Sequence, residues 1–354
     1  MPGHGPSPVV DVDRRELRGK AFACLDGCGF CCTFQPEVSS AEARALRTRV
    51  TPLKLLAHGD RSYLALQGGC GACSLLRDRS CTAYEARPLH CRTFPFHLYF
   101  GARVEAYVNW TCRGVESAPG SLDAAFEASI ASVARERLAT LVEESRASHA
   151  EFRRRARRAH AWGDAAAALA GIVARGGETF TSEGLEALAR EGGVEATSAD
   201  LMEEALEPFE ERDVVRRPFY LAPDLAWLTG ERDGDGLRIL SMDEAGGLTP
   251  RGRVAGLDHA PDLEASAREG LARILAALAE RDHFVGSAYH LVDEARYRLS
   301  VQEAVARRAA EVATDLVVRH RIVTALAPDR DAEDETRRFY DADFLDAPTI
   351  GGFL

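Results

Sequence analysis

Hydrophobic positions after residue 120 recur mostly at the spacing of a helix face. Leu122, Phe126 and Ile130 begin a series of apolar residues at three- and four-residue steps. This period predicts helices over residues 121–145, 148–174, 182–192, 198–207, 262–281 and 288–326. The segment from Asp329 reads instead as an acidic and then aromatic tail.

A different pattern fills the stretch from Val214 to about Val254. Short apolar runs alternate there with turn clusters such as the Asp-Gly-Asp-Gly run at residues 233–236, which is typical of strands joined by tight turns. We therefore expect a mainly α, α+β fold. In it, a larger helical region carries a short β-rich insertion and follows a small irregular domain.

The first third of the chain has little regular patterning. Ser39 followed by Glu42 has the form of a capping box and predicts a helix over about residues 40–50. Residues 63–66 and 104–108 are strand candidates by composition. The expected organisation is a flexible N-terminus at residues 1–20, a cysteine-rich domain at 21–115 and a predominantly helical domain at 121–354, with the β-rich segment at about 214–254.

All nine cysteines of the 354-residue chain lie in this first third. They stand at Cys24, Cys28, Cys31, Cys32, Cys70, Cys73, Cys81, Cys91 and Cys112. Thiolates are soft metal ligands and redox groups, and such tight spacing is not needed for packing. An odd number leaves at least one thiol over in any scheme made only of disulfides. The pattern indicates metal or redox chemistry.

Composition and charge indicate the cellular compartment and the classes of partner that we expect for this protein. The formal net charge of −11 argues against a general nucleic-acid binder, and the basic run at residues 153–158 is best read as a solvated helix face. No apolar run approaches the length of a membrane-spanning helix, and the N-terminus lacks the apolar core of a signal peptide. We expect a cytoplasmic protein without nucleic-acid or membrane partners, in which thiols stay reduced and serve as ligands.

Several metal centres fit this set of thiols. A single structural zinc needs four ligands, which Cys28, Cys31, Cys70 and Cys73 would supply as two pairs. An iron–sulfur cluster needs three or four thiolates on a flexible run, as residues 24–31 provide. Eight or nine thiolates would also hold two metals, or one cluster with bridging thiolates.

The triplet at residues 24–31 also matches that of radical S-adenosylmethionine enzymes, and a Gly-Gly-Glu tripeptide follows at residues 176–178. Those enzymes are built from repeated βα units, which the pattern here does not predict. The tripeptide is better read as the end of one helix and a turn into the next.

The first 115 residues resemble a known family. Cys28-Gly-Phe-Cys31-Cys32 and the run Cys81-Thr-Ala-Tyr84-Glu-Ala-Arg87-Pro88-Leu-His-Cys91-Arg92-Thr-Phe94-Pro95 are similar to the YkgJ family, whose zinc- or iron-chelating domain has the pattern CxxCxxCC. The resemblance covers about residues 20–115. This chain has three residues rather than two after its first cysteine, and Cys70 is additional.

The resemblance implies a set of ligands and a range of functions. Cys24, Cys28, Cys31, Cys32, Cys73, Cys81 and Cys91 fit the chelating pattern, Cys112 fits it less closely, and Cys70 is the extra thiol. Flagellin lysine methylases carry a similar cluster and are linked to an iron–sulfur centre and S-adenosylmethionine-dependent methyl transfer. A similar protein-modifying role is the specific catalytic expectation, with S-adenosylmethionine as a further cofactor.

Residues beside the cysteines suggest how a metal would be tuned. We expect Arg87 and Arg92 to compensate the negative charge of a thiolate cluster, and His90 and His97 to be structural. Two hypotheses follow. The first is an iron–sulfur, or otherwise zinc, protein with a redox or methyl-transfer role, acting on a protein partner or substrate through the helical region. The alternative is a non-catalytic structural-zinc module joined to a helical partner-binding domain.

Overall fold

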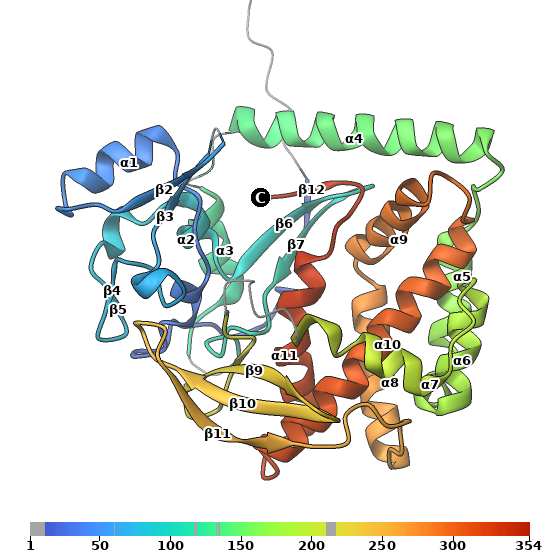
Figure 1. Ribbon diagram of the computed structural model, residues 1–354. Coiled ribbons are helices and arrows are strands. Elements are labelled where there is room, and N and C mark those ends of the chain that lie inside the picture. The colour runs from blue at the N-terminus through green and yellow to red at the C-terminus, as the bar shows by residue number, and fades with distance from the viewer. Residues whose placement is uncertain (1–10, 60, 117–118, 132, 134, 210–216) are drawn as a thin grey trace, which may run out of the picture.

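The computed structural model describes residues 11–354, apart from residues 60, 117–118, 132, 134 and 210–216. Helices take up 47% of the chain and strands 16%, so the fold is mixed α+β. Figure 1 shows the cysteine-rich segment, in blue, on one side of a small central sheet and most of the helices on the other. None of the described helices has the length and apolar character that crossing a membrane requires.

The central sheet joins segments far apart in the sequence. Its strand order is β1 (Val12–Asp13), β7 (Val104–Val108), β6 (Phe96–Phe100) and β12 (Gly352–Phe353). β6 and β7 form an antiparallel hairpin, β1 adds to it in parallel, and β12 adds to the other edge antiparallel. The strand expected at residues 104–108 is confirmed, whereas β6 was not predicted.

The flexible N-terminus expected at residues 1–20 is wrong for its described part, residues 11–20. Val12 and Asp13 pair with Val104 and Glu105, and Leu17 is completely buried. Pairing and burial both fix this segment against the sheet. Residues 1–10 lie outside the described residues.

Short elements build the cysteine-rich segment. They are the 3-10 turns η1 (Phe30–Thr33), η2 (Gln67–Gly69) and η3 (Tyr84–Ala86), the helices α1 (Ser40–Arg47) and α2 (Leu89–Thr93), and the hairpins β2 (Leu55–His58) with β3 (Arg61–Leu64) and β4 (Leu76–Arg77) with β5 (Ser80–Cys81). The capping box is confirmed, since the Ser39 side chain accepts from the Glu42 N–H and the Glu42 carboxylate accepts from the Ser39 N–H. The strand expected at residues 63–66 ends at Leu64.

The helical region is organised around one buried helix, α10 (Val301–Leu326). The other helices are α3 (Leu122–Ile130), α4 (Arg135–Arg158), α5 (Ala165–Val173), α6 (Ser182–Glu191), α7 (Ser198–Glu204), α8 (Ala265–Ala279), α9 (Asp282–Glu294) and α11 (Ala332–Asp346), with 3-10 turns η4 (Gly176–Phe180) and η5 (Glu207–Phe209). α10 contacts α5, α6, α7, α8, α9 and α11, and most of its residues are buried. A helix enclosed in this way forms the core of the region.

Three helix boundaries differ from the prediction. Residues 121–145 are divided between α3 and α4, and α4 continues to Arg158 through the expected break. The helix expected at 148–174 breaks where His160 has a φ of +55°. The helix expected at 288–326 is two helices, because Arg296 and Tyr297 have positive φ angles and a capping box at Ser300 starts α10.

The acidic and aromatic tail is a helix, α11. Asp331 caps it by accepting from the N–H groups of Glu333 and Asp334, and acidic residues in a first turn suit a helix N-terminus. Phe339 and Phe344 are completely buried, so α11 belongs to the core.

A second sheet confirms the strands predicted before Val254. Its antiparallel order is β11 (Leu248–Val254), β10 (Gly236–Met242), β9 (Trp227–Asp233) and β8 (Tyr220–Leu221), and residues 214–216 lie outside the described residues. Trp227 and Met242 share a buried cluster with Phe30 and Leu76 of the cysteine-rich segment. In Figure 1 this sheet lies below the cysteine-rich segment.

Candidate metal centre

Eight of the nine thiols lie close enough to influence one another's ionisation. They come from four parts of the chain: residues 24–32, the β4–β5 hairpin with Cys73 just before it, α2, and the turn after β7. The eight are Cys24, Cys28, Cys31, Cys32, Cys73, Cys81, Cys91 and Cys112. All nine cysteines are free thiols. The fold thus gathers residues that the sequence leaves up to 88 positions apart (112 − 24).

Backbone conformation shapes the first cysteine loop. Gly27 and Gly29 have φ angles of +71° and +61°, a region that residues with a Cβ rarely adopt. The Cys28 N–H donates to the Leu25 carbonyl, and the Cys32 N–H donates to the Gly29 carbonyl. Two successive tight turns therefore curl residues 24–32 so that their side chains converge.

Burial makes the site unfavourable for free thiolates. It raises the pKa of Cys73 to about 11 and the pKa of Cys112 to about 12, and it also raises the pKa values of Cys28 and Cys91. Cys31 is the exception, because a hydrogen bond from the Cys32 thiol, together with the charge of Arg87, lowers its pKa. A bound cation would supply the charge that holds the other thiols as thiolates, so the donor set fits a thiophilic metal.

The thiols are near one another without being closed around an ion. Within the described ranges, a single group of three His, Cys, Asp or Glu side chains has all its ligand atoms within 4.8 Å of one another. That group is Asp235, Asp258 and His259, and it includes none of the thiols.

The two arginines expected beside the cluster take different places. The positive charge of Arg87 favours the thiolate forms of Cys24, Cys31 and Cys81, so its guanidinium faces the thiols. The same side chain stacks 3.5 Å above the Tyr84 ring. Arg92 instead lies 4.0 Å from the Glu42 carboxylate, where it pairs with α1.

Arg79 contacts the first cysteine loop and was not predicted. Its guanidinium donates to the Cys28 carbonyl at 3.1 Å and stacks 3.8 Å above the Trp227 ring. The Trp227 indole donates to the same carbonyl at 3.0 Å. A cation between Cys73 and Cys81 was visible in the sequence, but Trp227 lies 199 positions from Cys28 and gave no signal.

Arg79→Met should weaken metal binding by about 10- to 100-fold, as loss of groups supporting a ligand does in other metal sites. It removes both the charge near Cys28 and one of the two donors to its carbonyl. Competition with a chromophoric chelator measures the affinity. Arg44→Met, at an exposed position on α1, is the matched control, and an equal affinity in the two variants would contradict this role.

Cys70 and His97 pack against other parts of the fold. A Cβ placed on Gly246 would come within 2.8 Å of the Cys70 sulfur, so this thiol packs against the β10–β11 turn. Burial lowers the pKa of His97 to about 4, and its ring packs edge-on against Phe353. His97 is thus held neutral in the interior.

One comparison with known proteins bears on this geometry. Residues 23–113 match the family model CxxCxxCC, described as a putative zinc- or iron-chelating domain. We call residues 23–113 the CxxCxxCC domain after this match. The cysteine-cluster resemblance seen in the sequence is confirmed, and the boundaries of the match enclose all eight clustered thiols. No curated protein and no solved structure matches the chain.

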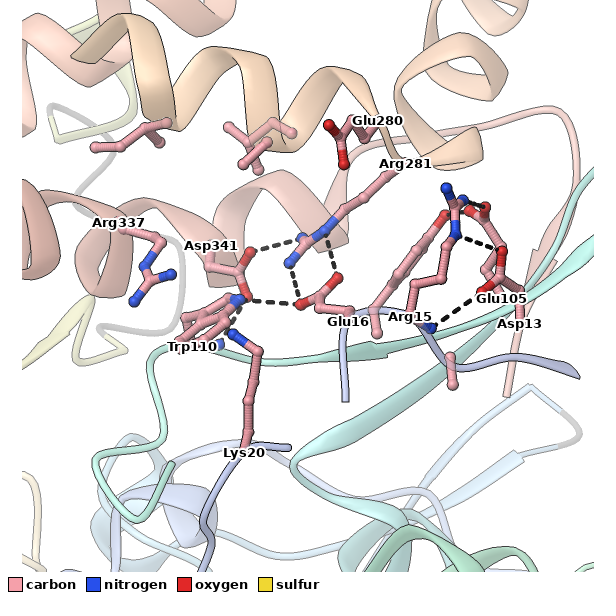
Figure 2. A pocket seen from close by; sticks show the side chains of 15 residues that line it. Asp13, Arg15, Glu16, Lys20, Glu105, Trp110, Glu280, Arg281, Arg337 and Asp341 are labelled. Carbon is pink, nitrogen blue, oxygen red and sulfur yellow. Dashed lines mark hydrogen bonds and ion pairs between the residues drawn. The ribbon is translucent and has the colours of Figure 1, made fainter. Parts of the chain in front are cut away.

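A charged cavity of about 290 Å³ borders the CxxCxxCC domain. Figure 2 shows Arg281 at its centre, reaching Glu16 and Asp341. The Arg281 guanidinium is 2.8 Å from Glu16 and 2.7 Å from Asp341, and only 6% of its side chain is exposed. Although burial alone would lower it, the two carboxylates raise the pKa of Arg281, which stays a cation.

Trp110 connects this cavity to the thiols. Its backbone N–H donates to Asp341 and its indole donates to Glu16, while Lys20 and Arg337 lie 4.1 and 3.6 Å from its ring. Because Trp110 stands two residues before Cys112, the buried ion network fixes the backbone that carries this thiol. The cavity therefore serves as an anchor for one corner of the CxxCxxCC domain.

Proposed function

We propose that the CxxCxxCC domain binds iron as an iron–sulfur centre, or otherwise zinc, and that the centre serves a redox reaction with a protein partner. Convergence of eight thiols from four segments carries this proposal, because a single structural zinc needs only four ligands. The arginines Arg79 and Arg87 supply positive charge beside the thiols, as an anionic thiolate cluster requires.

Exposure of part of the centre favours electron transfer. Cys24 and Cys31 are exposed, so one side of the cluster reaches the surface. Tyr84 stands 48% exposed beside them with Arg87 stacked on its ring, and an exposed aromatic residue with an arginine suits a protein contact. The surface formed by Cys24, Cys31, Tyr84 and Arg87 offers the partner a direct approach to the metal.

Methyl transfer to a protein has weaker support in the fold. It would need a site for S-adenosylmethionine beside the centre, and the Gly-Gly-Glu tripeptide at residues 176–178 does not lie there. It begins η4, which packs against α8 in the helical region, away from the thiols (Figure 1).

A structural-zinc module with a helical partner-binding domain is the second candidate. Cys73 is buried among Val38, Leu46 and Leu75, as a ligand with a purely structural role would be. Under this alternative the metal replaces part of the apolar core that the short elements of the CxxCxxCC domain lack.

An absorption spectrum of protein purified without oxygen separates the two. We expect a broad band near about 400 nm from thiolate-to-iron charge transfer, which should bleach on reduction with dithionite. A colourless protein with stoichiometric zinc would contradict the redox proposal and support the structural one.

A further inference from the structure

The eight clustered thiols are twice what one tetrahedral ion or one four-iron cluster takes from a protein. Each such centre uses four thiolates, and a ninth thiol, Cys70, lies against the β10–β11 turn. Backbone contacts around the eight thiols divide them into two groups of four.

One group is built around the first loop and the turn after β7. The Ala23 N–H donates to the Gly114 carbonyl at 3.2 Å, and Phe22 and Val115 form an antiparallel bridge. These contacts lay the start of the cysteine loop beside Cys112.

The other group is built around Cys73. Its N–H donates to the Cys32 carbonyl at 2.7 Å, which holds residue 73 against η1. Cys32, Cys73 and Cys81 pack in one apolar cluster with Leu75 and Ala83. The helix carrying Cys91 is docked there through the Leu89 N–H, which donates to Glu42 of α1 at 2.6 Å.

Cys31 and Cys32 are adjacent in sequence and stand at the boundary. Cys32 packs against the apolar cluster of the second group and also, like Cys28, against the cluster around Trp227, whereas Cys31 follows Cys24 and Cys28 on the first loop. Each group has a cation on a nearby backbone carbonyl: Arg79 donates to the Cys28 carbonyl, and Arg77 donates to the carbonyl of Ser74, the residue after Cys73.

Given the metal binding proposed above, we infer that the CxxCxxCC domain contains two four-cysteine metal sites. Cys24, Cys28, Cys31 and Cys112 form the first, and Cys32, Cys73, Cys81 and Cys91 form the second. The Cys31–Cys32 peptide joins them, so the two ions are close neighbours. The first site includes both exposed thiols and faces solvent, whereas the second includes the buried Cys73.

Anaerobic titration of the metal-free full-length protein with Co²⁺ tests this division, because cobalt replaces zinc in thiolate sites and is coloured there. We expect the natural protein to bind two equivalents of Co²⁺. The control variant Cys70→Ser, which loses a thiol outside both sites, should also bind two equivalents. The double variants Cys24→Ser/Cys112→Ser and Cys81→Ser/Cys91→Ser should each bind one equivalent.

The other outcomes separate this inference from the proposed function. One equivalent in the natural protein, or loss of all binding in both double variants, would show a single centre and overturn the division while metal binding stands. Two equivalents retained in both double variants would overturn the ligand assignment. No cobalt binding in the natural protein would overturn both. The endpoint of the natural protein decides between one and two centres even where a double variant does not fold.

Discussion

Stripping the metal from the CxxCxxCC domain should lower the free energy of unfolding by at least about 5 kcal/mol, because metal binding to structural thiolate sites contributes on the order of 10 kcal/mol. The turns that carry most of its thiols have little apolar core of their own. The domain's own apolar cluster around Leu46 and Cys73 is small, and its elements are short turns and hairpins. Thermal unfolding with and without a chelator, followed by re-addition of the metal, measures the loss.

The loss should be local and should depend on pH. Helical circular dichroism should largely persist, because the core around α10 contains no cysteine. Thiols must lose protons to bind metal, and burial raises the pKa of the free Cys73 thiol to about 11. Protons therefore compete more strongly as pH falls, so the metal-dependent stability is present at higher pH and is lost on acidification. An unchanged unfolding temperature in the chelator, with metal loss verified, would refute this account.

Arg281→Leu should lower the free energy of unfolding by about 3–5 kcal/mol, the range for removing one partner of a buried ion pair. The change would leave Glu16 and Asp341 facing each other without their cation, and Asp341 is only 1% exposed. Denaturant unfolding of the metal-loaded protein measures the difference.

Arg273→Leu provides the matched control. Arg273 pairs with Glu333 at 2.6 Å, but 64% of its side chain is exposed, so its loss should cost less than about 1 kcal/mol. Adding Asp341→Asn to Arg281→Leu should recover part of the loss by removing one unpaired charge. If the two arginine variants were equally stable, the cavity would not be an anchor.

Local signals in the sequence predicted local structure well. The capping box at Ser39 and the composition of residues 104–108 depend on neighbouring residues, and both elements formed as expected. β6 was missed although, like β7, it is an aromatic and apolar strand buried on both faces. α11 was missed because its acidic first turn hid the helical spacing of Tyr340 and Phe344, although Asp331 is a sound N-cap.

The candidate site was predictable in its chemistry and not in its arrangement. Spacing predicts the cysteines as ligands, which stays a prediction, and position beside the cysteine run pointed to Arg87, whose charge favours the thiolate forms of Cys24, Cys31 and Cys81. Arg92 has the same kind of position but turns toward Glu42, because α1 packs against that part of the chain. The roles of Arg79 and Trp227 depend on how the second sheet docks against the first loop, which no local pattern encodes.

Pairing of β12 with β6 has a consequence for how the protein is made. A chain leaves the ribosome from its N-terminus, and domains generally fold as they emerge. All nine cysteines emerge early, yet β6, which follows Cys91 by a few residues, receives its second neighbour only when residues 352–353 arrive. The cysteines are therefore synthesised well before the strand that completes the sheet beside them.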